Sequence, residues 1–270
     1  MSSENHSQKR HLILRLEAPL IAFGGVTIDN YGFTRDFPAR SMLTGLIANA
    51  LGWQRTDREA HQALQDRLIY AARREREPFV GHLQDVQNAR LYAKEEGWTT
   101  RGVPEGRNKA SSSFDARDNN FETLGKYQTH QRFRDYHPDA LVMIALRLEP
   151  SHDTPDLDDL IKAFRAPARP LFFGRKPCLP SAPLLSANPV IEAPSVGEAL
   201  ALIARDPDGK TKAQHLRAIW PPGEAPLSPH ETDKTMDICD ERNWRSSLHG
   251  GTRRLVEGRL LPAEAKEVIS

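Results

Sequence analysis

The sequence has few of the features that mark secreted, membrane-spanning or polycationic proteins. Its 270 residues include only two cysteines, Cys178 and Cys239, too few for a disulfide framework or a cysteine-based zinc site. No run approaches the roughly 20 apolar residues of a transmembrane helix, and the polar start MSSENHSQKRH lacks the apolar run of a signal peptide. The formal net charge of +1 excludes a uniformly basic nucleic-acid binder. We therefore expect a cytoplasmic protein that makes no use of a membrane, a cofactor or a metal.

The first part of the chain alternates strand and helix patterns. Residues 11–17 alternate apolar and polar side chains in part, which predicts a half-buried strand ended by Pro19. Ser41 is placed to cap a helix whose apolar side chains share one face. Asp57 to Arg67 predicts a second helix, with Asp57 as its cap, and Leu68 to Arg73 a returning strand.

A long polar segment interrupts this pattern. Residues 82–134 are rich in Gly, Asn, Ser, Thr and charge, and they exceed the roughly 12–15 residues beyond which loops in compact domains are uncommon. We interpret them as an insertion that forms a protruding hairpin. After it, residues 140–148 predict a buried strand, Thr154 and Pro155 the cap and first residue of a helix, and residues 184–191 a further strand.

The order of these elements predicts an α+β protein. Strand, helix, strand, strand, helix and strand is the ferredoxin-like (RRM-like) order, also used by RNA-recognition domains, and here it covers residues 11–191 with the insertion included. Residues 192–270 open with a helix capped by Ser195 and Glu198, followed by proline-rich stretches between short apolar segments. We expect a small β-rich C-terminal region there.

Positive charge concentrates in two segments that contain glycine. Residues 165–176 hold four basic and no acidic side chains, and residues 242–259 hold five arginines against one glutamate. Glycine lets a phosphate approach the backbone, and arginine offers a planar fork to phosphates and a flat face to bases. Phe172, Phe173 and Trp244 are interspersed with these charges. The combination is typical of single-stranded RNA binding, although a solvated surface and buried aromatics explain the same residues.

Three motifs carry a resemblance to a known family. Leu12–Leu20 followed by Phe23–Gly24 resembles its opening, and Phe37–Ser41 with the helix after it resembles its segment FPxRS…GLLxxxLG. Arg169–Cys178 is similar to its loop YLGRRSCPxxxPL. The similarity covers most of residues 11–190. On these motifs the chain resembles the CasD family, the subunit of type I-E Cascade that binds the 5′ handle of CRISPR RNA (crRNA) and belongs to the RAMP superfamily.

The resemblance implies a ferredoxin-like domain with a hairpin "thumb" in the insertion, and a non-catalytic role in capping the 5′ handle of crRNA. The implied partners are crRNA, the backbone and large subunits of Cascade and, through the complex, target DNA. The implied RNA-binding positions are Phe23, Gly24, Arg35, Arg40, Ser41, Arg169, Gly174, Arg175 and Lys176. In the thumb, the basic candidates are Arg90, Arg101, Arg107, Lys109 and Arg117. At Arg40–Ser41, the N-terminus of a helix would offer free backbone donors to a phosphate.

An enzymatic interpretation stays open beside this one. A related branch in type I-C systems cleaves precursor crRNA without metal, which needs a His or Tyr base and a cation such as Lys. The candidates for such an endoribonuclease are His249, Tyr31 and Lys176. The motifs favour the type I-E-like branch, in which a separate subunit cleaves, so we expect no catalysis by this chain.

Overall fold

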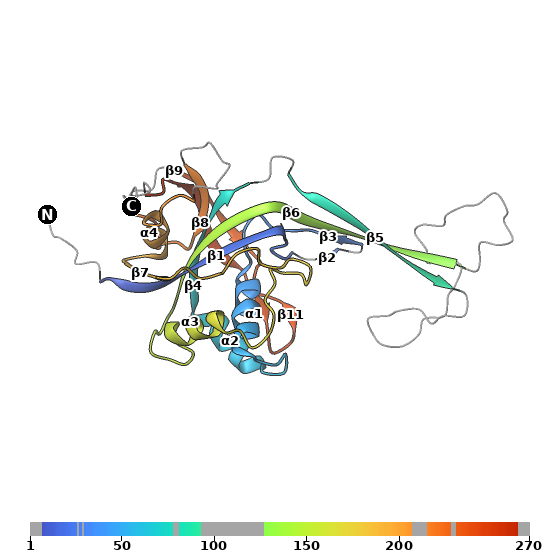
Figure 1. Ribbon diagram of the computed structural model, residues 1–270, viewed down its shortest axis with the longest axis horizontal. Coiled ribbons are helices and arrows are strands. Elements are labelled where there is room, and N and C mark those ends of the chain that lie inside the picture. Colours follow the sequence, from blue (N-terminus) through green and yellow to red (C-terminus); the bar gives the residue numbers. More distant parts are fainter. Residues whose placement is uncertain are drawn as a thin grey trace. The chain divides into compact units, whose positions relative to one another are not determined.

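The computed structural model describes residues 7–25, 27–28, 30–77, 81–92, 127–206, 215–227 and 231–263 (Figure 1). The chain divides into two compact units. The first comprises Met1–Gly25, Thr34–Leu83 and Tyr136–Ser270, and the second comprises Val26–Phe33 and Gln84–Asp135. In chain order the elements are β1 (Lys9–Ile21), β2 (Thr27–Ile28), β3 (Tyr31–Gly32), α1 (Arg40–Leu51), α2 (Arg58–Arg67), β4 (Leu68–Arg76), β5 (Leu83–Tyr92), β6 (Tyr127–Leu148), α3 (Leu157–Arg165), β7 (Val190–Ala193), α4 (Val196–Ala201), β8 (Leu216–Trp220), β9 (Glu231–Ile238), β10 (Arg242–Asn243), β11 (Leu248–His249) and β12 (Arg253–Leu260).

The first unit is built on one antiparallel sheet with the order β7-β1-β6-β4-β8-β12-β9. β6 lies between β1 and β4, and its Ile144 pairs with Leu14 on one side and Ala72 on the other. The chain is thus a mixed α/β protein with a large antiparallel sheet and few helices. Within the described residues, no helix combines the length and apolarity needed to cross a membrane.

Both faces of this sheet are buried, which explains the weak alternation in β1. Leu12 and Leu14 pack in the core with residues of α1, α2 and α3, whereas Ile13 packs on the other face with Val196 and Leu200 of α4. Because successive strand side chains point to opposite faces, an apolar residue is needed at nearly every position of a strand covered on both sides. Figure 1 shows α1–α3 grouped apart from α4.

Pro19 does not end the first strand as predicted, since β1 continues to Ile21. β7 pairs with β1 only as far as Leu12, so Pro19 lies where β1 has β6 as its strand neighbour on one side alone. A proline is tolerated there because its missing N–H removes no ladder bond on the open side.

The predicted start of α3 is also wrong. Thr154 and Pro155 precede the helix, Asp156 is the N-cap, and its carboxylate accepts from the amide of Asp159, whose own carboxylate accepts from the amide of Asp156. This reciprocal capping box satisfies two free helix donors and places negative charge at the positive end of the helix dipole.

The C-terminal strands continue the main sheet instead of forming a separate small region. β8 pairs with β4, β12 with β8, and β9 with β12, while β10 and β11 form a ribbon of their own. A domain boundary at residue 192 stays a prediction.

The second unit contains the β2–β3 hairpin and the described parts of the insertion. β5 pairs with β6, and β3 pairs in parallel with β6 through Tyr31 opposite Phe133. Of the predicted thumb residues, Arg90 lies in β5 with its side chain outside the described residues. The others, Arg101, Arg107, Lys109 and Arg117, lie outside them altogether.

Candidate functional site

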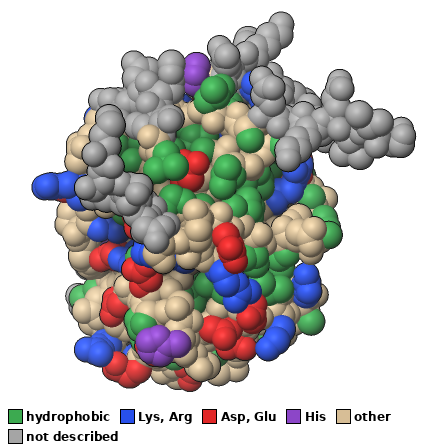
Figure 2. Space-filling view, turned by 90° about the vertical axis from the view of Figure 1, so that its left-hand side faces the viewer, with side chains coloured by type: hydrophobic (Ala, Val, Ile, Leu, Met, Phe, Trp, Pro, Cys, Tyr) green, Lys and Arg blue, Asp and Glu red, His purple; other side chains and the backbone are tan. Residues whose placement is uncertain are grey.

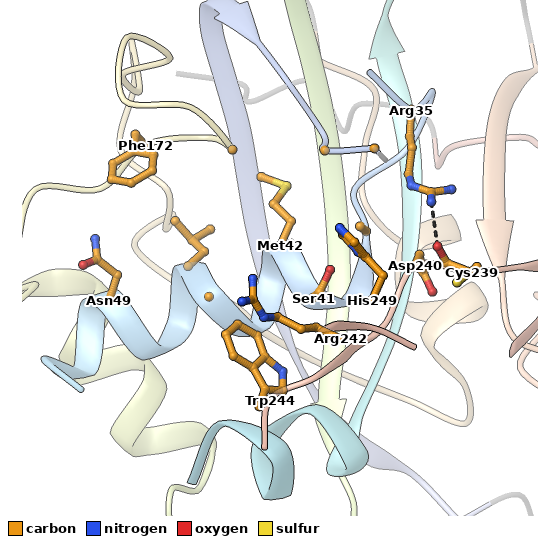
Figure 3. Close-up of a pocket in the computed structure, with 16 residues that line it drawn as sticks. Arg35, Ser41, Met42, Asn49, Phe172, Cys239, Asp240, Arg242, Trp244 and His249 are labelled. Carbon is orange, nitrogen blue, oxygen red and sulfur yellow. Dashed lines mark hydrogen bonds between the residues drawn. The ribbon is translucent and has the colours of Figure 1, made fainter. Parts of the chain in front are cut away.

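A cavity of about 370 Å³ lies in the first unit, beside α1 and β10–β11 (Figure 3). The residues that line it come from segments far apart in the chain. Five of them were candidates from the sequence, namely Gly24, Arg35, Ser41, Gly174 and His249. The fold therefore brings together residues from all three motifs and from the C-terminal basic segment.

Aromatic and basic side chains face this cavity together. Phe172 and Trp244 contribute rings, and Arg35, Arg242 and His249 contribute cations or titratable nitrogen. Pockets that hold organic ligands commonly combine such apolar walls with a few polar groups, over roughly 300–1,000 Å³. The cavity has the size and the chemistry for an unpaired nucleotide.

Trp244 is held in place by three contacts. Its indole Nε1 donates to Oε1 of Gln65 at 3.0 Å, its backbone N–H donates to Oε1 of Gln62 at 3.0 Å, and its ring lies 4.7 Å from the ring of His61. The guanidinium of Arg242 lies 5.3 Å from the centre of the indole. The aromatic wall is therefore fixed by α2 before any ligand enters.

Arg242 has an unsatisfied donor. Its Nη2 donates to the carbonyl of Ser247 at 3.1 Å, but its buried Nε has no hydrogen-bond partner among the described residues. Burial lowers the pKa of Arg242. A buried donor without a partner costs about 1–3 kcal/mol.

The start of α1 is closed to a phosphate, contrary to the prediction. The amide of Arg40 donates to Oδ2 of Asp240 and the amide of Ser41 to the carbonyl of Asp240, both at 3.0 Å. Asp240 is 3% exposed and also accepts two bonds from Arg253, each at 2.8 Å. The N-cap is Ala39 and no side chain of the helix caps it, so the predicted capping by Ser41 is wrong. An aspartate 200 residues away supplies the acceptors that a phosphate would otherwise provide.

The side chain of Arg40 bonds to other parts of the same chain. It pairs with Glu241 at 2.6 Å, and its Nε and Nη2 donate to the carbonyl of Leu68 at 3.0 and 2.7 Å. Nη2 also lies 3.2 Å from the carbonyl of Asp66. Its guanidinium therefore joins α1 to the α2–β4 connection and has little left to offer RNA.

Arg169 and Phe23 are likewise structural in this fold. Arg169 donates to the carbonyls of Gly52 and Trp53, both at 2.8 Å, where a cation is favourable at the C-terminal end of α1. The ring of Phe23 is fully buried, 5.3 Å from the ring of His137. The ring of Phe23 is closed to RNA, and the half-buried Arg169 uses two guanidinium nitrogens on these carbonyls.

The glycine loop, residues 174–176, has the opposite character. Gly174 has a φ of +83°, and a Cβ there would lie 1.8 Å from the carbonyl oxygen of Ala22, so only glycine fits this close approach. The guanidinium of Arg175 lies 4.7 Å from the ring centre of Tyr136, and Lys176 is exposed. This loop presents positive charge to solvent.

The three nuclease candidates do not form one site in the first unit. His249 lines the cavity from β11, and Lys176 lies in the glycine loop without lining that cavity. Tyr31 belongs to the second unit. Of the two candidates in the first unit, His249 alone lines the cavity.

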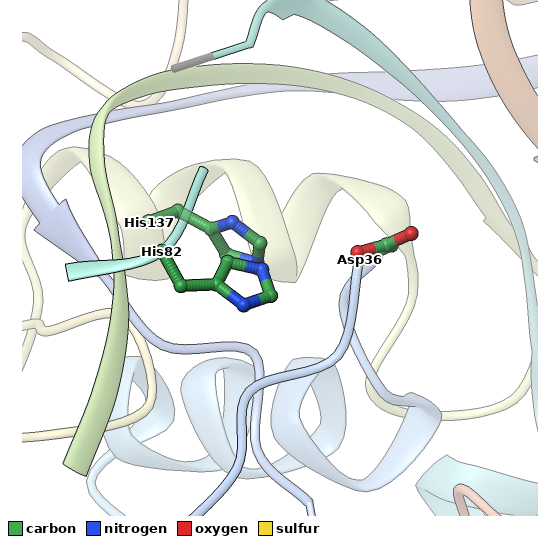
Figure 4. Close-up of side chains that lie close together, drawn as sticks. All are labelled: Asp36, His82 and His137. Carbon is green, nitrogen blue, oxygen red and sulfur yellow. The ribbon is translucent and has the colours of Figure 1, made fainter. Parts of the chain in front are cut away.

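Asp36, His82 and His137 bring their ligand atoms within 4.8 Å of one another (Figure 4). His137 is buried, which lowers its pKa to about 4 and keeps it neutral at pH 7. The Asp36 carboxylate, however, is already paired with Arg217 at 2.9 Å and with Arg74 at 3.7 Å. Two guanidinium groups beside the carboxylate oppose a cation, so we interpret the cluster as an ion-pair network.

On one face of the molecule both signs of charge are mixed. On the face seen in Figure 2, Lys and Arg side chains alternate with Asp and Glu, and hydrophobic side chains lie between them. This face offers no continuous basic surface, in keeping with the net charge of +1.

Several cavity residues were not assigned from sequence. Arg242 and Trp244 stood out only as part of a basic, aromatic segment, Phe172 as an aromatic beside the glycine loop, and Asn49 and Asp240 not at all. Composition was the available signal for the first three. Which of them face the cavity depends on the β10–β11 ribbon and on long-range contacts.

Comparison with known proteins places this geometry in a family. The family model described as "CRISPR-associated protein (Cas_Cas5)" matches residues 11–256. The chain therefore belongs to the Cas5 family of CRISPR-associated proteins. Within that class it is similar to the "CRISPR system Cascade subunit CasD" of Escherichia coli (strain K12), with 31% identity over 176 residues, which are 65% of this chain and 70% of the relative.

Two solved structures share the fold. One, described as "CRISPR RNA-guided surveillance complex", has a TM-score of 0.56 at 19% identity and covers 95% of each chain. The other, described as "Crystal structure of Cas protein", has a TM-score of 0.56 at 21% identity and covers 93% of this chain and 95% of its own. The fold match extends over nearly the whole chain, including the C-terminal strands.

Proposed function

We propose that the chain is a non-catalytic subunit of a type I, I-E-like Cascade complex, in which it binds and caps the 5′ handle of crRNA. The observation that carries this proposal is the 31% identity over 176 residues with a relative named as a Cascade subunit. Its partners are crRNA, the backbone and large subunits and, through the complex, target DNA during interference. A metal-independent endoribonuclease is not favoured, because Lys176 does not line the cavity that His249 lines.

The sheet supports a ferredoxin-like assignment for the first unit. Numbered among themselves, β1, β4, β6 and β7 lie in the order 4-1-3-2, with α1 and α2 following the first of these strands and α3 following the third. All neighbours among these four strands are antiparallel. This order supports the β-α-β-β-α-β arrangement, in which the helices α1, α2 and α3 pack on one face of the sheet.

The handle site that we propose combines the cavity with the glycine loop. An unpaired base would lie against Phe172 or Trp244, and its phosphate would accept from Arg242 or Arg35 at the rim. Arg175 and Lys176 would bind the adjacent phosphates. Stacking of a base on an aromatic side chain contributes roughly 1–3 kcal/mol, and each neutralised phosphate adds a salt-dependent gain.

The test compares two fluorescein-labelled RNAs with the same spacer, one carrying the repeat-derived 5′ handle and one lacking it. Fluorescence anisotropy with the purified full chain should show roughly tenfold tighter binding of the handle RNA, and Arg242→Ala should remove most of this preference. Arg254→Ala is the matched control, since Arg254 is exposed and pairs with Asp237, which is also exposed. Equal affinity of the wild type for both RNAs would contradict the handle-binding proposal.

Catalysis is tested with the same material. A labelled repeat hairpin incubated with the chain in EDTA should remain intact over hours. Site-specific cleavage that disappears in His249→Ala would establish the endoribonuclease instead.

A further inference from the structure

Three aromatic rings of the second unit form a nearly parallel group, in which Tyr31 and Phe33 are exposed and Phe133 is half-buried. The ring of Tyr31 lies 4.7 Å from that of Phe133 with an interplanar angle of 12°, and 6.1 Å from that of Phe33 with an angle of 15°. We name Tyr31, Phe33 and Phe133 the aromatic platform. Parallel ring planes at these spacings are the geometry in which aromatic systems stack.

Backbone pairing fixes the platform. β3 and β6 pair in parallel with Tyr31 opposite Phe133, and the amide of Phe133 donates to the carbonyl of Asn30 at 2.9 Å. Phe33 follows Tyr31 by two residues, so both side chains point to the same side of extended backbone. The rings are therefore held in place by main-chain bonds and not by burial in a core.

The platform is open to solvent. Tyr31 is 45% and Phe33 47% exposed. Among the described residues, Phe33 and Phe133 each contact one ring only, that of Tyr31. Each of them thus keeps a ring face without an aromatic neighbour in the described part of the chain. Large exposed aromatic surface of this kind marks an interaction site.

Positive charge lies on the strand that carries Phe133, on the face opposite its ring, because successive side chains of a strand point to opposite faces. Arg132 and Arg134 flank Phe133 in β6, and both bond through Nη1 to Asn30, the residue before Tyr31. In the described part of the chain these arginines use no nitrogen other than Nη1 for hydrogen bonds. Nε and Nη2 of each can therefore serve a phosphate. Asp135 is the acidic side chain closest along β6, and it accepts from Gln84 at 3.1 Å.

We propose that the aromatic platform stacks on unpaired bases of single-stranded RNA while Arg132 and Arg134 bind the adjoining phosphates. The inference deepens the proposed function, on which it rests, by adding a base-binding surface separate from the handle cavity. Ring planes within 15° of one another favour a stack of bases. The charge of the neighbouring arginines favours a polyanion over the apolar face of another subunit. Tyr31 acts here through its ring, without a role in proton transfer.

The experiment uses the full chain and the handle RNA, with the fluorescent adenine analogue 2-aminopurine placed at one spacer position at a time. Stacking on an aromatic ring quenches this base. We expect quenching at particular positions in the wild type, and its loss in Phe33→Ala and Phe133→Ala with roughly 5- to 100-fold weaker binding. Phe33→Trp should keep both signals, because it keeps a π-face.

Two variants separate stacking from other roles. Phe33→Leu keeps an apolar side chain without a π-face and should behave like Phe33→Ala. Val86→Ala removes a 49% exposed apolar group from the same unit and should change nothing. Circular dichroism and melting curves like those of the wild type confirm that each variant is folded.

The outcomes distinguish the two proposals. Loss of handle preference in the wild type overturns the proposed function itself. Intact handle preference with wild-type quenching in Phe33→Ala and Phe133→Ala overturns the platform alone. Wild-type RNA binding in Phe33→Leu and Phe33→Ala, together with loss of co-purifying subunits in Phe33→Ala, would assign the rings to protein docking and overturn base stacking.

Discussion

The start of α1 and the glycine loop resemble the same family through basic motifs, yet the fold treats them in opposite ways. At the start of α1, Asp240 takes the first two amides and Glu241 takes the guanidinium of Arg40. In the glycine loop, Lys176 is exposed and Arg175 lies over a tyrosine ring. The same family resemblance therefore covers a basic residue that is bound to a carboxylate of the protein, Arg40, and one that is exposed, Lys176.

At the start of α1, the acidic residues that are near in space differ from those that are near in the sequence. The segment that contains the glycine loop has no acidic side chain between Arg165 and Lys176. The start of α1 has none in its own first turn either, but the Asp240–Glu241 pair reaches it from the far end of the chain. Local charge composition therefore misses the two carboxylates that reach the start of α1.

The largest expected effect concerns Asp240. Asp240→Ala should lower the free energy of unfolding by about 3–5 kcal/mol, because the guanidinium of Arg253 is left largely buried without its carboxylate. Urea unfolding measures this. Asp237→Ala is the control: its pair with Arg254 is more than half exposed on both sides and contributes about 1 kcal/mol or less. Equal, small losses in the two variants would show that Asp240 does not hold the start of α1.

Gly174→Ala tests whether the close approach of the glycine loop to Ala22 requires a glycine. A Cβ 1.8 Å from the carbonyl of Ala22 forces the backbone apart, so we expect a loss of about 2–4 kcal/mol in thermal or urea unfolding. Gly223→Ala matches it in φ, at +81°, with nothing within 4 Å of the added Cβ, and should lose only about 1 kcal/mol. Similar losses of stability at the two glycines would show that the close approach to Ala22 does not restrict residue 174.

Acid should weaken the segment that leads into α1. Burial lowers the pKa of His137 from 6.5 to about 4, while its Nε2 donates to the carbonyl of Arg35 at 2.7 Å. The unfolded chain then binds the proton more readily, so stability is full above pH 6.5 and falls towards pH 4 by up to about 3 kcal/mol. Unfolding measured at pH 7.5, 5.5 and 4.5 should show a shallower decline in His137→Gln.

Two comparisons sharpen the pH experiment. His152→Gln is the exposed control and should follow the wild type, since that side chain is 83% exposed. His11 is also buried with a pKa lowered to about 4 by burial, so part of the decline should survive in His137→Gln. An unchanged decline in His137→Gln would contradict the role of His137.

The smallest effect on stability is expected in the glycine loop. Arg175→Ala with Lys176→Ala should leave unfolding within about 0.5 kcal/mol. It should weaken handle RNA binding roughly tenfold and reduce the salt slope by about 1.4, since each phosphate contact to a single strand contributes about 0.7. Arg40→Ala should do the reverse, destabilising the fold with no change of salt slope. If the salt slope falls in Arg40→Ala and not in the loop variant, the start of α1 binds phosphate and the glycine loop does not.

Local pattern predicted the elements better than it predicted their ends. The apolar periodicity of β1, α1 and β6 gave their positions, because each needs a buried face that one side chain in two or in three to four must supply. The element boundaries predicted from Pro19, Ser41 and Thr154 were wrong. Each is a sound local signal, but a one-sided strand, a distant aspartate and a nearer capping box decided the ends instead.

The residues of the candidate site were also only partly predicted from the sequence. Gly24, Arg35, Ser41 and Gly174 carry motifs and do meet at one cavity. Arg40 and Arg169 belong to the same motifs, but they donate to internal carboxylate and carbonyl oxygens. A guanidinium that binds RNA and one that ties two helices together look alike in a sequence, because the identity of the acceptor is a property of the fold.

The sequence by itself determined the family resemblance, the large α+β core and the glycine that shapes the 174–176 loop, because these depend on residue order, apolar spacing and local backbone freedom. The tertiary structure alone decided which basic residues face solvent and which rings of the second unit stack. Both outcomes depend on contacts between residues far apart in the chain, as between Arg40 and Glu241 or between Tyr31 and Phe133. Such contacts leave no trace in local composition, since their energy comes from the partner's position in space.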